Sequence, residues 1–122
     1  MKNDHRTMGA WGERCAARYL WWHGYRILDR NYRCRSGEID LIACRQGFLV
    51  FVEVKLRKDD SHGAAREFVD YQKKKRLLLT AKYYLSHHET KLQPRFDVVE
   101  IYAPRGRATW LPKIVHWEDA FQ

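Results

Sequence analysis

The sequence predicts an α/β protein in three layers, with a helix on each side of a small central mixed sheet. Three observations lead to this class. Residues 7–23 and 65–86 carry apolar side chains at helical spacing. Residues 36–57 read as a hairpin that is apolar on both faces, so both faces need a covering layer. The length of 122 residues fits one domain, 1–122, and the expected element order is α-β-β-β-α-β-β.

Composition narrows the class of protein. Hydrophobic residues make up 45% of the chain and five are tryptophans, which favours a folded core. No apolar run approaches the roughly 20 residues of a membrane span, and no apolar run follows the first charged residues, so we expect a cytoplasmic protein without a membrane partner. The cysteines Cys15, Cys34 and Cys44 form no CxxC pair, and we expect free thiols rather than a zinc site.

The charge balance points to a polyanionic partner. Lysine and arginine number 23 against 15 acidic residues, which gives a formal net charge of +8. Nucleic acid is the commonest partner of such a surface, although the charge alone is weak evidence.

The first helix is expected over residues 7–23. It can be capped by Thr7 or Asp4 and ends before Gly24. Glu13 lies off the apolar stripe and, taken alone, fits a solvated helix position. The stripe at spacings of three and four consists of Met8, Trp11, Cys15, Tyr19 and Trp22.

A strand over residues 25–33 leads through a turn into the hairpin. If Gln46 and Gly47 form a two-residue loop, paired positions sum to 93, and Asp40 faces Glu53. Glu38 then faces Lys55. Glutamine is a poor first residue for such a turn, so a three-residue loop with a bulge is an alternative.

Strand alternation sorts the hairpin side chains onto two faces. One face would hold Ile39, Leu41, Ala43, Val50, Val52 and Val54. The other would hold Ile42, Cys44, Leu49 and Phe51 beside the charged residues.

The opposed acids need a compensating charge. Two like charges at about 4 Å repel by roughly 4 kcal/mol at an effective dielectric of 20. A divalent cation such as Mg²⁺, which prefers carboxylate oxygens, would relieve the repulsion between Asp40 and Glu53. Lys55 could offset it only in part.

The second half supplies the remaining elements. A polar loop is expected over residues 57–64 and a helix over 65–86. Its apolar arc includes Phe68, Val69, Leu78, Leu79, Ala81 and Leu85. A strand over residues 95–103 should run parallel to the second hairpin strand. Pro112 restricts the last strand, 108–117, to a sheet edge.

Basic residues cluster within the second helix. The run Lys73, Lys74, Lys75 and Arg76 goes round one whole turn, so at least one of the four must face the sheet or its edge. The run forms either a solvated basic face or, together with Arg57, a set of phosphate contacts.

The hairpin acids carry a family resemblance. Asp40 followed by Glu53-Val54-Lys55 resembles the signature of PD-(D/E)xK nucleases, with Ile39 in place of the proline. The segments GEIDLIA and FVEVK, together with Gly12-Glu13, Asn31-Tyr32-Arg33, Lys73 and Ala120-Phe121, resemble the YraN family of uncharacterised bacterial proteins. That family is similar to the archaeal Holliday-junction resolvases of the restriction-endonuclease-like fold. The resemblance extends from Gly12 to Phe121.

The resemblance implies a role for each site residue. Asp40 and Glu53 would ligate Mg²⁺ or Mn²⁺, with the Val54 carbonyl as a further ligand. Lys55 would orient or help deprotonate the attacking water, and cleavage would leave a 5′-phosphate. Glu13 would face the metal site from the first helix, and Lys73 matches a lysine of the second helix, with an alignment that is uncertain by one position.

Three functions follow from these observations. The first is a metal-dependent endonuclease of structured or branched DNA, with DNA preferred over RNA and a homodimer as in the resolvases. The second is a nucleic-acid-binding protein of the same fold with little or no cleavage. The third is a protein-interaction adaptor with a structural charge cluster. A salt bridge from Glu38 to Lys55 would make Lys55 less available for catalysis.

Overall fold

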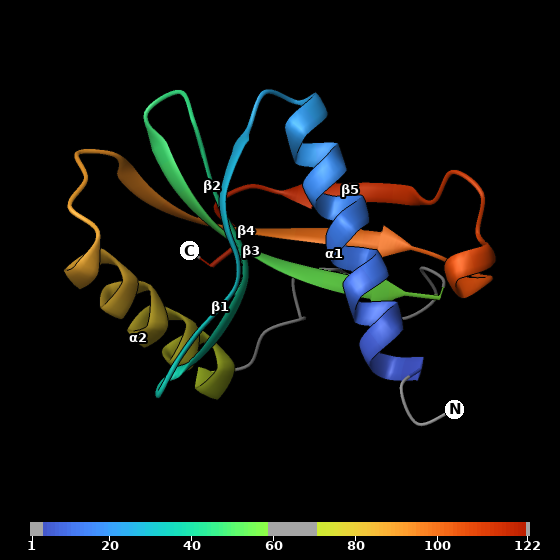
Figure 1. Cartoon of the computed structure of the whole chain (residues 1–122), viewed down its shortest axis with the longest axis horizontal. Coiled ribbons are helices and arrows are strands. Elements are labelled where there is room, and N and C mark those ends of the chain that lie inside the picture. Colours follow the sequence, from blue (N-terminus) through green and yellow to red (C-terminus); the bar gives the residue numbers. More distant parts are fainter. Residues whose placement is uncertain (1–3, 59–70, 122) are drawn as a thin grey trace.

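The computed structural model describes residues 4–58 and 71–121. It contains a mixed sheet with two α-helices (Figure 1). In chain order the elements are α1 (Asp4–Trp22), β1 (Arg26–Cys34), β2 (Gly37–Arg45), β3 (Phe48–Arg57), α2 (Tyr71–His87), β4 (Gln93–Tyr102), the short 3₁₀ helix η2 (Gly106–Ala108) and β5 (Lys113–Trp117). Among the described residues, no helix is long and apolar enough to cross a membrane.

The sheet confirms the predicted class. Its strand order is β1-β2-β3-β4-β5, with β3 and β4 parallel and the other neighbours antiparallel. Leu41 packs in the core cluster that contains α1 residues, whereas its neighbour Ile42 packs in the cluster that contains α2 residues. Because consecutive strand residues point to opposite faces, α1 and α2 cover opposite faces of the sheet.

The predicted hairpin register is confirmed. The β2–β3 pairs run from Arg45 with Phe48 to Leu41 with Val52, and every pair sums to 93. Gln46 has a φ of 47° and Gly47 a φ of 86°, as a two-residue turn of the mirror-image type requires. The three-residue alternative is therefore wrong. Gln46 adopts a positive φ, which residues other than glycine and asparagine rarely do.

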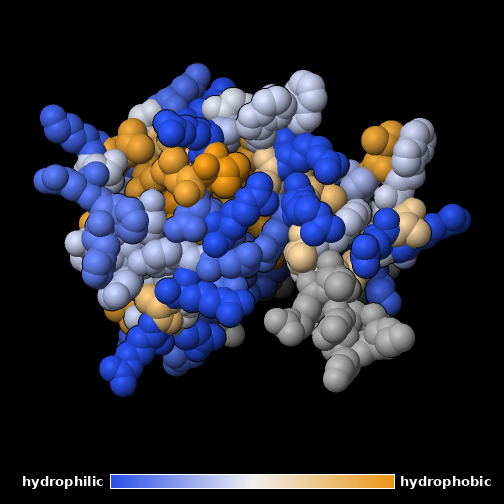
Figure 2. All heavy atoms as spheres, in the orientation of Figure 1, coloured by the Kyte–Doolittle hydropathy of each residue, from blue (hydrophilic) through white to orange (hydrophobic). Residues whose placement is uncertain are grey.

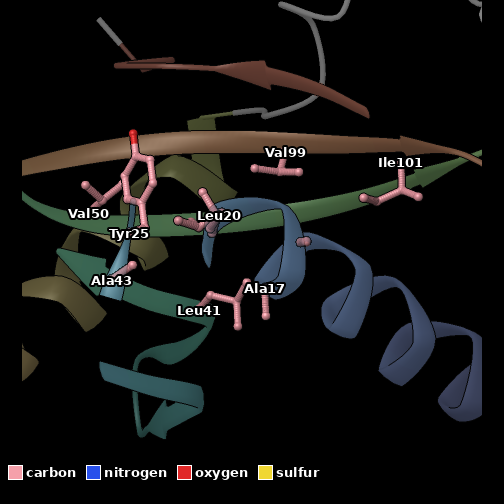
Figure 3. Packing of buried hydrophobic residues seen from close by; sticks show 10 residues of the cluster. Ala17, Leu20, Tyr25, Leu41, Ala43, Val50, Val99 and Ile101 are labelled. Carbon is pink, nitrogen blue, oxygen red and sulfur yellow. The ribbon is translucent and has the colours of Figure 1, made fainter. Parts of the chain in front are cut away.

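The core lies in two clusters that flank the sheet. Figure 3 shows the first, where Leu20 of α1 packs with Leu41 and Val50 of the hairpin. The second joins α2 to the other face of the sheet through Ile42, Phe51 and their neighbours. Ile39 packs in this second cluster, so its predicted face was wrong. Regular β2–β3 pairing ends at Leu41, and strict alternation does not extend beyond that point.

The buried faces of both helices match the prediction only in part: Trp11, Cys15 and Tyr19 of α1 and Ala81 and Leu85 of α2 pack against the core as predicted. In α1 the fully buried side chains are Ala16 and Leu20, whereas Trp22 of the predicted stripe is 73% exposed. In α2, Leu78 and Leu79 are exposed, and the predicted Phe68 and Val69 lie outside the described residues. The buried side chains of α2 are Leu77, Thr80, Ala81 and Tyr84. The helix has apolar side chains on several faces, and packing selects the face that also carries Lys73.

β4 contains a buried acid that the sequence pattern did not reveal. The Asp97 side chain is 0% exposed and accepts two hydrogen bonds from Arg95, at 2.9 and 2.8 Å. His116 Nε2 of the edge strand β5 lies 2.7 Å from the same carboxylate, and the backbone N–H of Asp119 donates to it at 3.0 Å. This network fastens β5 and the C-terminal turn to the sheet. β5 itself is shorter than predicted and begins just after Pro112.

Candidate active site

The predicted acids meet where β2 and β3 separate. The paired ladder ends at Leu41 and Val52, and the next residues, Asp40 and Glu53, both line one pocket of about 280 Å³. α2 forms the opposite wall with Lys73 and other residues. The complete lining is Gly37, Glu38, Asp40, Glu53, Lys73, Arg76 and Leu77.

The Asp40 carboxylate bridges the two strands beyond the end of the ladder. The Val54 backbone N–H donates to Asp40 Oδ2 at 2.8 Å, in the place where a regular ladder would bond Val54 to Ile39. Since the N–H and C=O of one strand residue point to the same side, the Val54 carbonyl also faces this gap. The position predicted for it as an oxygen ligand is therefore consistent with the backbone geometry.

The environment of Asp40 opposes its ionisation. Burial raises the pKa of the Asp40 carboxyl to about 7, and the negative charge of Glu53 adds to this effect. Glu13 and Glu38 raise the pKa further, whereas the hydrogen bond from Val54 lowers it. Burial and the neighbouring carboxylates thus both disfavour the charged form of Asp40.

Two lysines approach Glu53. Lys73 Nζ lies 2.6 Å from Glu53 Oε2, and Lys55 Nζ lies 3.6 Å from the same oxygen. Burial lowers the pKa of Lys55, and the adjacent Lys73 lowers it further. Burial alone would lower the pKa of Lys73, but the hydrogen bonds and the charge of Glu53 outweigh it and raise the pKa. Lys55 is therefore the lysine that more readily gives up its proton.

The predicted contact between Glu38 and Lys55 is absent from the described ion pairs. Glu38 instead pairs with Arg33 of β1 at 3.3 Å. Lys55 remains directed toward Glu53, as a role at the acidic pocket requires.

Glu13 reaches the vicinity of the acids from α1. Its side chain is partly buried, and burial raises the pKa of its carboxyl, whereas a hydrogen bond from Asn31 lowers it. Glu13 also contributes to the raised pKa of Asp40. The partner Asn31 has a φ of 51°, a conformation that asparagine tolerates better than most residues.

The predicted basic residues separate into two groups. Lys73 and Arg76 line the pocket, while Lys74 is half-buried and Lys75 is exposed. Lys73 was predicted as a nucleic-acid contact, and the structure adds the ion pair with Glu53. The one-turn spacing of the run, which places at least one of its members toward the sheet, and the match of Lys73 to a family lysine were the sequence signals for this contact.

Arg57 forms an ion pair with a buried carboxylate. Its Nε lies 3.0 Å from Glu100 of β4, whose side chain is 1% exposed. Trp117 Nε1 also donates to Glu100, at 2.8 Å. No sequence pattern points to a role for Glu100, because its burial depends on neighbours from β3 and β5 that are distant in the chain.

The donor set fits a hard divalent cation. Among the described residues, no three Asp, Glu, His or Cys side chains form a ready metal cluster. Mg²⁺, however, is commonly bound by one or two carboxylates, with waters and substrate phosphate completing its coordination. Asp40 and Glu53, with the inward-facing Val54 carbonyl, supply that number of protein ligands.

Comparison with known proteins places the chain in a family. Residues 12–101 match the model of the uncharacterised protein family UPF0102. The UPF0102 protein of Caldanaerobacter subterraneus subsp. tengcongensis is 41% identical over 121 residues, which are 98% of each chain. That of Syntrophotalea carbinolica is 45% identical over 99% of this chain and 96% of its own. The predicted YraN-family resemblance is confirmed, and the chain belongs to the uncharacterised protein family UPF0102.

Proposed function

We propose that the protein is a metal-dependent endonuclease that hydrolyses phosphodiester bonds of structured or branched DNA. One observation carries the proposal: Asp40 and Glu53 line a single open pocket, and Lys55 and Lys73 approach the carboxylate of Glu53. Two acids held together at the mouth of a separated strand pair destabilise a fold, which favours a functional reason for their position.

Each group has a chemical role in this proposal. Asp40, Glu53 and the Val54 carbonyl would hold Mg²⁺ or Mn²⁺, which supplies Lewis-acid stabilisation of the phosphate and a more acidic bound water. Lys55, whose pKa is lowered by burial, is suited to accept a proton from the attacking water. Lys73 and Arg76 line the same pocket and would balance the negative charge that develops on the phosphate.

A second function is favoured by the position of Lys73. Its ammonium lies 2.6 Å from Glu53 and can act as an internal substitute for a metal ion. A protein in which this contact persists would bind nucleic acid through its basic surface and cut little or none. The two functions differ in whether a divalent cation displaces Lys73 from Glu53.

Cleavage assays on a panel of DNA substrates test the proposal. Purified protein is incubated with four-way junction, flap, single-stranded and duplex DNA in Mg²⁺, in Mn²⁺ and in EDTA. We expect cutting of a structured substrate in either metal, with a 5′-phosphate on the product. Asp40→Asn and Lys55→Ala should lower the rate by at least about 100-fold while DNA binding persists.

Matched variants show whether the losses are specific. Glu89→Gln and Lys91→Ala change exposed residues outside the pocket and should leave cutting intact. Cutting that persists in Asp40→Asn would refute the proposed site. If the protein cuts no substrate with either metal but still binds DNA in a salt-sensitive way, the nucleic-acid-binding function is favoured. Size measurement of the active species tests the homodimer expected from the resemblance.

A further inference from the structure

A second cavity lies between α1 and β1, outside the acidic pocket. It measures about 890 Å³, which is within the range of cavities that take organic ligands. Among the described residues that line it, four are arginines and none is acidic: Arg14, Arg18, Arg26 and Arg30. Trp21 also lines it, and 64% of this side chain is exposed. We call this cavity the arginine groove.

The arginines of the groove form no ion pairs with the described acidic side chains. No ion pair joins any of the four guanidinium groups to a carboxylate of residues 8–58 or 71–121. All four residues are exposed. Figure 2 shows hydrophilic residues over much of the face that carries α1, together with a hydrophobic patch in its upper left part. Four like charges around one concave surface produce a positive potential that a polyanion would neutralise.

The spacing of these residues suits an extended ligand. Arg14, Arg18 and Trp21 stand at positions i, i+4 and i+7 of α1, so they share one helix face along about 10 Å. Arg26 and Arg30 stand four residues apart on β1, a separation of about 13 Å along the strand. The groove therefore has cationic groups on both walls, with an exposed indole on the helical wall.

The arginine groove is electrostatically connected to the acidic pocket. Arg30, which lines the groove, acts on the Glu13 carboxyl and lowers its pKa. Glu13 in turn acts on Asp40. Arg14 and Arg30, which line the groove, are the chain neighbours of Glu13 and of its hydrogen-bond partner Asn31.

We propose that the arginine groove binds an unpaired nucleic-acid strand, with its arginines on successive phosphates and Trp21 stacked on a base. This inference rests on the proposed function, since it names a substrate feature that the nuclease would bind. Bases inside a duplex are stacked on their neighbours on both faces, whereas an unpaired base offers a free face to an exposed aromatic ring. The substrate class is therefore DNA or RNA with a single-stranded segment.

Binding measurements in EDTA test the groove separately from cleavage. Fluorescence anisotropy is recorded for wild-type protein with dye-labelled oligo(dT), oligo(rU) and a blunt hairpin duplex. Trp21→Ala should weaken binding of a single strand on the order of ten-fold and leave the duplex affinity nearly unchanged. Arg18→Ala should weaken single-strand binding and lower its salt slope by about one.

Two control variants match these changes elsewhere on the surface. Trp110→Ala removes an indole that is 86% exposed, and Arg105→Ala removes an exposed guanidinium outside the groove. Both should bind like wild type. Circular dichroism of each variant checks that the fold is retained.

The outcomes distinguish a failure of the groove proposal from a failure of the nuclease proposal. A loss that depends on Trp21 with either oligonucleotide supports the groove, and the larger loss shows whether DNA or RNA is preferred. If wild type also fails to cut any substrate, the groove stands and the nuclease is refuted. Unchanged single-strand affinity in Trp21→Ala and Arg18→Ala, or no binding by wild type, overturns the groove even if the protein cuts DNA.

Discussion

Replacing Asp40 by asparagine should make the metal-free protein more stable. The side chain stays nearly the same size, and its oxygen can still accept the hydrogen bond from Val54. The substitution removes only the buried charge that Glu53, Glu13 and Glu38 repel. A residue kept for packing alone would show the opposite effect.

The magnitude follows from the pKa of Asp40. A rise from 3.8 to about 7, at about 1.4 kcal/mol for each pH unit, means that ionising Asp40 costs roughly 4 kcal/mol more in the folded protein than in the unfolded chain. Relaxation around the charge reduces this figure, and we expect a gain of about 2–4 kcal/mol at pH 7.5. Each kcal/mol of added stability should raise the Tm by roughly 3–6 °C.

The pH dependence has a defined sign. Because the folded pKa lies above the unfolded one, wild type avoids this penalty below about pH 4 and acquires it as pH rises toward 7. Asp40→Asn never acquires it. The difference in unfolding free energy between the two proteins should therefore be small at pH 4 and should reach its plateau near pH 7.

Urea unfolding in EDTA at pH 4 and at pH 7.5 measures this difference, with Glu89→Gln as the exposed control. Saturating Mg²⁺ or Mn²⁺ should then stabilise wild type by about 2.7 kcal/mol at 100 times the Kd and should stabilise Asp40→Asn far less. Equal stability of the two proteins at pH 7.5, or a gain that is the same at both pH values, would refute the argument for a buried acidic cluster.

Two further predictions concern the framework around the site. Gly12→Ala should lower the free energy of unfolding by about 1–3 kcal/mol in urea, because the added Cβ would lie 3.0 Å from the Leu56 side chain. A Cβ added at Gly9 would meet no atom within 4 Å, so Gly9→Ala should cause no loss. Burial would raise the pKa of Asp97, but hydrogen bonds led by that of His116 lower it. Asp97→Asn should therefore cost about 3 kcal/mol at pH 7, and the difference should vanish as pH falls through the lowered pKa; an unchanged difference in acid would contradict this account.

Strand periodicity and turn chemistry determined the register of the hairpin and the position of its two acids. Two apolar runs around Gln46 and Gly47 admit few registers, and the chosen one places Asp40 and Glu53 together at the end of the ladder. Side chains in a strand repeat every two residues, so a single register fixes the face of each regular position. The segments around these acids also carried the family resemblance that the comparisons confirm. The metal, the substrate and the reaction remain predictions.

Only the tertiary structure decided which helix faces are buried and which charged groups meet. Lys73 belongs to a basic run whose members look alike in the sequence, and its contact with Glu53 depends on how α2 rotates against the sheet. Asp97 lies inside the protein because Arg95 and His116 surround it, the latter from a strand far along the chain. The arginine groove likewise exists only because α1 packs beside β1. Helix rotation and contacts between distant segments are set by the free energy of the whole packed core, which no local pattern encodes.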